Sequence, residues 1–434
     1  MSLADHYTPA QVSEWVLDAR QRTLELVADL SDEQMMGPRI STVNPVLWEI
    51  GHHAWFQSNW VLREACGQPP VREDEDALYD SMAIAHDTRW DLLLPPREKT
   101  IAYICEVRDR VLDELASPNC SEEVLYHAIY STLHEDMHAE ALTYTRQTHG
   151  YTPPSLSGIA PNAGTAASGT IEGDATVPGG TFMLGSTRDE PFLFDNEKWA
   201  HPVEIAPFAI SKSAVTQKAY LGFVEAGGYS EREFWCGEGW AWREAEAAEH
   251  PVYWKKEGSS WLRRHFDTWG ELETDLPVIH VNWYEANAFC KWAGRRLPTE
   301  AEWEAAATVS GPDLSDTKLR FPWGGGESTP ETANLDCAAM GCVAAGGLPA
   351  GDSGFGCRQM VGNTWEWTSD PFRPYPEFTP DPYKDYSEPW FETRKSMRGG
   401  CWATRSRLIR PNYRNFQTPD RRDIWVGFRT CALS

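Results

Sequence analysis

The chain has 434 residues, of which 41% are hydrophobic and 24% charged, which is enough for two or three globular domains. It carries 64 acidic and 39 basic residues, and its net charge of −25 disfavours binding to nucleic acid or to anionic membranes. No apolar run approaches the roughly 20 residues that span a bilayer, and the N-terminus lacks the basic and apolar regions of a signal peptide. We therefore expect a cytoplasmic protein.

Residues 1–150 are predicted to form four helices. The first begins at Thr8, a capping residue followed by proline, and the second begins after Asn44, again before a proline. A third helix follows the apolar spacing of residues 101–115, and a fourth runs from Ser121 to a glycine stop at Gly150. Four such helices joined by loops predict a four-helix bundle.

The remainder of the chain has a different composition. Residues 151–175 are rich in Pro, Gly, Ser, Thr and Ala without apolar periodicity, which predicts a linker. Residues 176–434 contain short strand-like segments, glycine-rich turns and most of the 21 tryptophans. The ten cysteines are scattered without a C-x-x-C pair, so a thiolate zinc site is not expected. The predicted fold class is α+β.

A histidine pair in the fourth helix is the first candidate for chemistry. His134 and His138 are four residues apart, so both lie on one helix face at a distance suited to one metal ion. The segment also matches the H-E-x-x-H pattern of zinc metallopeptidases, in which Glu135 would be the general base. The alternative interpretation is a solvated polar helix face.

A second histidine cluster, His52 and His53, lies in the second predicted helix. Metal sites in bundles are built from facing helices, so one histidine from this pair would complete a set of three nitrogen ligands. Adjacent helical residues diverge by about 100°, so only one of the two can face the metal. We interpret His53 as lying at the helix surface or behind the ligands. Imidazole ligands suit iron, zinc or copper.

Residues 176–434 resemble the formylglycine-generating-enzyme (sulfatase-modifying factor) fold, a C-type-lectin-like module. Five segments carry the resemblance: residues 177–185, 277–283, 294–304, 362–367 and 398–402. These enzymes use a cysteine pair in the segment after the R-G-G-x-W motif. Here that segment, residues 403–411, has no cysteine, so formylglycine-generating activity is not expected.

A DinB-like bundle joined to this module resembles the ergothioneine sulfoxide synthase family. The resemblance implies a non-heme Fe(II) enzyme that uses O₂ to join sulfur to the imidazole C2 of hercynine (Nα-trimethylhistidine). It implies His52, His134 and His138 as the iron ligands, in a W-[DE]-x-x-H helix and an H-E-x-x-H helix.

The same resemblance implies functional residues in the C-terminal module. Tyr383 matches the family's active-site tyrosine, with Tyr386 the weaker candidate, and Asn415 and Phe416 match a hercynine-contacting stretch. A phenol can supply a proton during oxygen reduction. An aromatic ring close to a trimethylammonium group attracts it through a cation–π interaction.

The sequence departs from the family where the sulfur donor would bind. Members that use γ-glutamylcysteine carry an arginine pair in the bundle, whereas this chain has one arginine beside an acid, and it has Gln417 in place of an acid and Met137 in place of a glutamine. A lone arginine is a poor clamp for a dianionic peptide. The pattern resembles the selenoneine synthase branch, whose donor is a selenosugar. The expected donor-binding residues are Asp87, Arg89, Trp90, Met137 and Gln417.

We therefore expect iron- and O₂-dependent C–Se bond formation between hercynine and a selenosugar. Its nearest alternative is a C–S bond-forming sulfoxide synthase that uses γ-glutamylcysteine or cysteine. Two interpretations from other classes are a zinc metallopeptidase and a lectin-like binding module on a metal-stabilised bundle.

Overall fold

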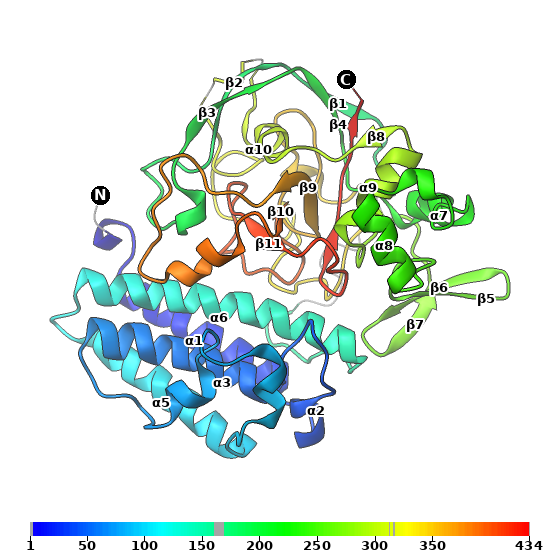
Figure 1. The fold of residues 1–434 in the computed structure, drawn as a ribbon. Helices are drawn as coiled ribbons and strands as arrows, with labels where there is room; N and C mark the ends of the chain where they lie inside the picture. The colour runs from blue at the N-terminus through cyan, green and yellow to red at the C-terminus, as the bar shows by residue number, and fades with distance from the viewer. Residues whose placement is uncertain (1–2, 160–168, 312, 316, 434) are drawn as a thin grey trace. The chain divides into compact units, whose positions relative to one another are not determined.

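The computed structural model describes residues 3–159, 169–311, 313–315 and 317–433, and the chain divides into two compact units, residues 1–158 and 159–434. The first unit is helical, and the second contains both helices and sheets, which confirms the predicted α+β class (Figure 1). Within the expected linker, residues 160–168 lie outside the described residues, and Asp174 and Ala175 already belong to strand β1. No helix in the described ranges is long and apolar enough to cross a membrane.

Over residues 3–158, four long helices form the first unit, and α1 and α3 each pack against both α5 and α6. Thr8 caps α1 by accepting a hydrogen bond from the Gln11 N–H, and Gly150 ends α6 in the left-handed conformation with φ 68°. The four predicted helices are confirmed. The α-helices are α1 (Pro9–Val27), α2 (Asp32–Met36), α3 (Val46–Gln57), α4 (Glu75–Tyr79), α5 (Arg97–Ala116) and α6 (Glu122–His149). Two 3₁₀ turns, η1 (Leu3–Asp5) and η3 (His86–Asp91), complete the unit.

The end of α3 departs from regular helix. It continues as a π-helical segment, η2 (Ser58–Ala65), which the apolar spacing did not predict. The buried Glu75 carboxylate ties this junction to two neighbouring elements. It accepts hydrogen bonds from Ser58 Oγ at 3.0 Å and from the Tyr103 hydroxyl at 3.0 Å. Because Glu75 begins the short helix α4, these bonds fix α4, and with it Tyr79, beside α3.

Among its described residues, the second unit contains four small sheets with the strand orders β1-β4-β13-β8, β11-β10-β9-β12, β2-β3 and β5-β6-β7. Its strands are β1 (Asp174–Val177), β2 (Gly180–Leu184), β3 (His201–Ile205), β4 (Phe208–Ser211), β5 (Trp254–Glu257), β6 (Ser260–His265), β7 (Thr268–Glu271), β8 (Arg295–Arg296), β9 (Trp365–Pro371), β10 (Lys395–Arg398), β11 (Asn415–Gln417), β12 (Val426–Gly427) and β13 (Cys431–Ala432). Its α-helices are α7 (Gln217–Glu225), α8 (Gly237–Ala245), α9 (Trp283–Trp292) and α10 (Glu300–Thr308).

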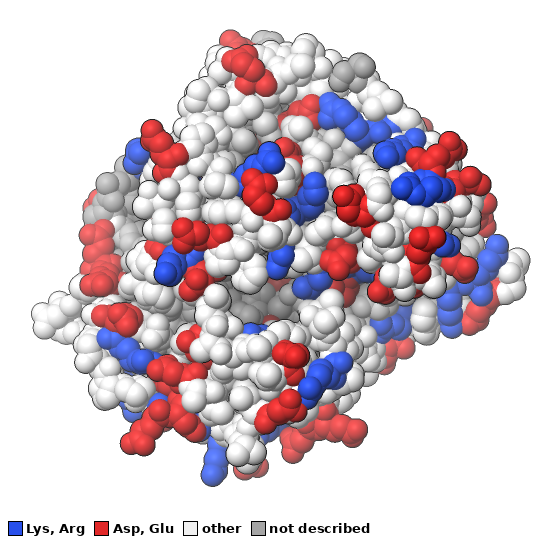
Figure 2. Space-filling model, in the orientation of Figure 1, with Lys and Arg blue, Asp and Glu red and all other residues white. Residues whose placement is uncertain are grey.

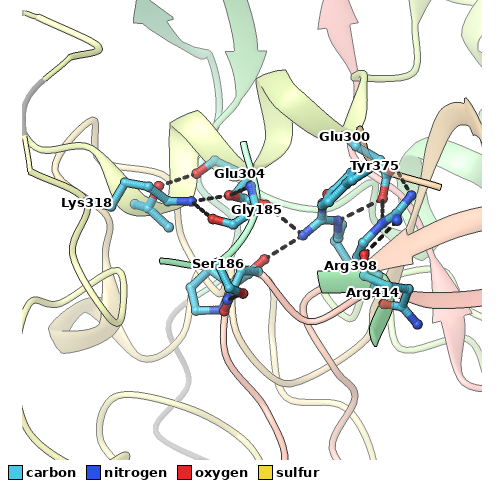
Figure 3. A network of polar contacts seen from close by, with 12 residues as sticks. Gly185, Ser186, Glu300, Glu304, Lys318, Tyr375, Arg398 and Arg414 are labelled. Atoms are coloured by element: carbon cyan, nitrogen blue, oxygen red, sulfur yellow. Dashed lines mark hydrogen bonds and ion pairs between the residues drawn. The ribbon is translucent and has the colours of Figure 1, made fainter. Parts of the chain in front are cut away.

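A buried network of charges holds the second unit together (Figure 3). Arg398 donates to Glu300 at 3.1 Å and to Glu304 at 2.9 Å, and Arg414 donates to the other oxygen of Glu300 at 2.9 Å. Buried charges of this kind must be paired, because an uncompensated partner is costly. The Arg414–Glu300 pair fixes the start of β11, which begins at the next residue, Asn415.

On the face in Figure 2, acidic and basic side chains are interspersed.

The Gly51→Ala substitution tests how closely α3 and α4 must approach. A Cβ at Gly51 would lie 2.2 Å from Cε1 of the Tyr79 ring, so that ring would have to move. We expect a loss of about 1–3 kcal/mol, seen as a lower urea midpoint for unfolding. Gly237→Ala is the matched control, since a Cβ at that position would have nothing within 4 Å. An unchanged midpoint for Gly51→Ala would contradict the close approach.

Candidate metal centre

Three histidine rings converge inside the helical unit. His52 comes from α3, and His134 and His138 come from one face of α6. One ring nitrogen from each lies within 4.8 Å of the others, and the Nε2 atoms of His134 and His138 are 3.3 Å apart. Two ligands about 2.1 Å from one ion are separated by roughly this distance. The donor set therefore fits a single metal ion with further coordination positions left for other molecules.

Hydrogen bonds to the second ring nitrogen orient two of these rings. His52 Nδ1 lies 2.8 Å from the backbone carbonyl of Tyr79, and His138 Nδ1 lies 2.9 Å from Oε1 of Glu49. A carbonyl and a carboxylate can only accept, so each Nδ1 carries the hydrogen and each Nε2 keeps its lone pair. Nδ1 of His134 is buried without a hydrogen-bond partner among the described residues.

Burial favours the neutral form of two of the rings, His52 and His134. Burial lowers the pKa of His52 and of His134 well below the usual value, and the neighbouring His138 lowers both further. Neutral imidazole is the form that binds metal ions. Aromatic rings cover two of the ligands, because Trp48 stacks on His52 at 4.9 Å and Phe56 stacks on His134 at 3.9 Å between ring centroids.

The glutamate of the H-E-x-x-H segment is engaged elsewhere. Glu135 is buried and accepts from Arg20 Nε at 2.8 Å, from Arg20 Nη2 at 3.1 Å and from Thr23 Oγ1 at 2.9 Å. A carboxylate held in this ion pair is not available as the general base of a metallopeptidase.

His53 is fully buried, so the expectation that it could lie at the helix surface is wrong. Its Nδ1 lies 3.6 Å from Glu135, and its ring centroid lies 6.2 Å from that of His138. It therefore lies behind the three converging rings, which is the second of the two positions expected from the sequence.

Three of the four donor-binding residues expected in the bundle, Asp87, Arg89 and Trp90, lie in η3. Arg89 is buried, and its guanidinium donates to Asn44 Oδ1 at 2.6 Å and to two backbone carbonyls of the preceding loop. Trp90 donates through Nε1 to the carbonyls at the end of α2, whereas Asp87 is exposed. Met137 is half-buried on α6, beside His138. Arg89 is therefore engaged within its own unit.

In the second unit, Tyr383 lies half-buried at the start of the 3₁₀ turn η7 (Lys384–Tyr386). The chain is anchored on both sides of it, by an ion pair between Lys198 and Asp381 at 2.6 Å and by a hydrogen bond from Ser387 to Asp195. Tyr386 packs its ring on Phe194 at 4.7 Å, and its hydroxyl lies 3.3 Å from that of Tyr413. Tyr386 is thus part of the packing.

Strand β11 carries the remaining expected residues. It pairs antiparallel with β10, so Asn415 and Gln417 point to one face and Phe416 to the other. The Phe416 ring stacks on Phe372 at 4.0 Å. Gln417 Oε1 accepts from Arg421 at 3.3 Å. The structure therefore separates Phe416 from the two polar side chains with which the sequence grouped it.

The sequence did not assign roles to Glu49, Tyr79 and Asn44. Glu49 and Tyr79 contact the histidines, and Asn44 contacts Glu49. Glu49 was detectable, because it is the acid three residues before His52 in the W-[DE]-x-x-H pattern. Tyr79 acts through its backbone carbonyl, which leaves no side-chain signal. Asn44 was recognised only as a helix start.

Comparison with known families agrees with this two-part organisation. Residues 17–142 match the DinB superfamily, and residues 160–433 match the sulfatase-modifying factor enzyme 1-like domain. The formylglycine-generating enzyme of Thermomonospora curvata is 32% identical over 60% of this chain and 93% of its own length. The class is thus an enzyme with a DinB-type bundle and a sulfatase-modifying-factor-type domain.

Two relatives match nearly the whole chain. The hercynine oxygenase of Mycolicibacterium smegmatis is 36% identical over 95% of this chain and 96% of its own length. That of Mycolicibacterium thermoresistibile is 35% identical over 97% of this chain and 94% of its own length. The chain belongs to the hercynine oxygenase family, the ergothioneine sulfoxide synthase-like non-heme iron oxidoreductases. The predicted family is confirmed.

Alanine substitutions test the metal centre directly. We expect His52→Ala, His134→Ala and His138→Ala each to lose bound iron, since two imidazoles hold an ion much less tightly than three. His53→Ala is the matched control and should keep its iron, although it also removes a buried ring. Iron per chain would be measured after anaerobic loading with Fe(II), with circular dichroism to check the fold. Iron loss in His53→Ala together with retention in His52→Ala would reverse the assignment.

Proposed function

We propose that this protein catalyses the oxidative coupling of a sulfur or selenium donor to the imidazole C2 of hercynine, with Fe(II) and O₂. The observation that carries this proposal is the set of three converging histidines in a chain that belongs to the hercynine oxygenase family. The coupling removes hydrogen from imidazole C2 and from the thiol or selenol of the donor. Oxidation of the coupled sulfur or selenium to its oxide releases two more electrons, so one O₂ accepts four electrons and ends as the oxide oxygen and one water. The iron would supply the position at which O₂ is reduced.

His52, His134 and His138 would hold the iron. The Tyr79 carbonyl and Glu49 would keep the rings of His52 and His138 turned with their Nε2 lone pairs inward. Trp48 and Phe56 would limit access of water to the rings that they cover. The bundle thus prepares three ligands and leaves the other positions of the ion open.

For the C-terminal unit we propose that Tyr383 holds a proton for the oxygen as it is reduced, and that Asn415 contacts hercynine. The family resemblance supports both assignments, and the anchored chain around Tyr383 supports a fixed position for its hydroxyl. Phe416 would support β11 from the opposite face through its stacking on Phe372. Tyr386 is the weaker candidate, since its hydroxyl is paired with that of Tyr413.

An oxygen-uptake assay tests the function as a whole. Protein purified and loaded with Fe(II) without oxygen should consume O₂ only when hercynine and a chalcogen donor are both present, and it should yield a coupled product by mass spectrometry. Replacing hercynine by histidine, which lacks the trimethylammonium group, is the substrate control. Hydrolysis of peptides with no hercynine-dependent O₂ uptake would contradict the proposal.

Tyr383→Phe removes one hydroxyl and leaves the ring in place. We expect less coupled product, by about ten-fold or more, with part of the donor oxidised on its own, since proton supply typically contributes about 100-fold or more to such steps. Product ratios would be measured by mass spectrometry at equal iron content. Tyr386→Phe is the matched control. Unchanged rate and products in Tyr383→Phe would show that its hydroxyl has no part in the reaction.

The chemical nature of the donor has two candidates. Family membership favours a sulfur donor, γ-glutamylcysteine or cysteine, and hence an ergothioneine-type sulfoxide synthase. A specific observation favours the second candidate, a selenosugar. Both Nη atoms of Arg89 donate to groups of the bundle, and Gln417 is neutral, so this pair differs from the charge clamp that a dianionic peptide requires. A neutral polyhydroxylated donor needs only hydrogen-bonding groups, such as the exposed carboxylate of Asp87.

A competition among donors distinguishes these candidates. Losing one charged partner at a binding site costs about 2 kcal/mol or more, which is close to thirty-fold in affinity. From the charge pattern we expect 1-seleno-glucose to give coupled product faster than γ-glutamylcysteine or cysteine, with hercynine and O₂ present. The three donors would be mixed at equal concentration and the products resolved by mass. Preference for γ-glutamylcysteine would assign the sulfur reaction instead.

A further inference from the structure

Arg89 is linked to the three converging histidines indirectly, by two separate sets of contacts. Its guanidinium carbon lies 3.9 Å from the ring centroid of Trp48, and the His52 ring also stacks on Trp48, at 4.9 Å between centroids and an interplanar angle of 7°. Trp48 is 1% exposed, and its Nε1 donates to the carbonyl of Leu78 at 2.7 Å. The position of the guanidinium therefore limits where the indole, and then the His52 ring, can lie.

The second route is a relay of hydrogen bonds. Arg89 Nη1 donates to Asn44 Oδ1 at 2.6 Å, and Asn44 Nδ2 donates to Oε2 of Glu49 at 3.4 Å. The other oxygen of Glu49 accepts from Nδ1 of His138. The Asn44 amide can link the two residues because its oxygen accepts from Arg89 while its nitrogen donates to Glu49, so the position of one partner restricts that of the other. The same relay places a positive group near the buried carboxylate of Glu49, which lies far from solvent.

We infer that Arg89 is a positioning residue for the metal centre, acting on His52 through Trp48 and on His138 through Asn44 and Glu49. This role rests on the proposed three-histidine centre. It assigns the guanidinium to holding two ligands in place and removes it from the groups that could clamp an anionic donor. Its shape is essential, because only a planar cation can stack on the indole and donate sideways to the amide at the same time.

Cobalt(II) provides a probe that does not depend on turnover. Its visible absorption reports the geometry of the ligands, and a titration gives the dissociation constant. We expect Arg89→Gln to weaken Co(II) binding by about 10–100-fold, as loss of groups behind metal ligands commonly does, and to change the absorption bands. Arg89→Lys keeps the charge without the planar fork, so it should weaken binding as well. The matched control is Arg39→Gln, whose arginine pairs with Asp91 at an exposed site and should leave Co(II) affinity unchanged.

Double variants separate the two routes. If the relay acts through Asn44, then Asn44→Ala should weaken Co(II) binding, and adding Arg89→Gln should cost less than in the wild-type background. Trp48→Phe reports the stacking route in the same way. These variants and Arg89→Lys also carry the test if Arg89→Gln does not fold.

The inference is overturned if Arg89→Gln and Arg89→Lys bind Co(II) as the wild type does. An increase in KM for γ-glutamylcysteine without any change in Co(II) affinity would instead make Arg89 a donor-binding residue. Failure of the underlying metal centre gives a different result, since wild-type protein and His52→Ala would then bind Co(II) equally.

Discussion

The hydrogen bonds from Nδ1 of His52 and His138 are the constraint on which the rest of the bundle depends. A histidine ring in a desolvated core can turn, and only a partner on its second nitrogen decides which lone pair faces the ion. The partner of His52 is a backbone carbonyl, so the whole of α4 must be placed correctly. Glu75 anchors that helix, and Gly51 allows the Tyr79 ring to approach α3.

Two buried glutamates near the histidines have different roles, although each belongs to a histidine motif: Glu49 to W-[DE]-x-x-H and Glu135 to H-E-x-x-H. Glu49 orients a ring and remains linked to Arg89 through Asn44, whereas Glu135 is closed in an ion pair with Arg20. The H-E-x-x-H pattern alone cannot distinguish a base from a structural carboxylate. The difference lies in Arg20, which comes from α1 and is 115 residues distant in sequence. The role of the glutamate in this motif therefore depends on the helix packed against it, here α1 with Arg20.

The sequence predicted what depends on local physics. The cap at Thr8, the helix start at Ser121 and the stop at Gly150 are confirmed, because each acts within one turn of helix. The π-helical segment after Gln57 and the face of Phe416 were not predicted. The first depends on a distant carboxylate, Glu75, and the second on the pairing of β11 with β10. Such features are set by tertiary contacts that no short window of sequence contains.

One arginine connects the rigidity of the metal centre with the charge of the substrates. The guanidinium of Arg89 has a limited number of donors, and those that contact Asn44 and the loop carbonyls cannot also bind a carboxylate of a donor molecule. A family member that keeps a charge clamp must therefore hold its ligands by other groups or carry additional arginines. In this chain the contacts of Arg89 with Trp48 and Asn44 would leave fewer of its N–H groups for a charged donor. Neutral-donor preference and a rigid ligand set would then be two consequences of a single placement of Arg89.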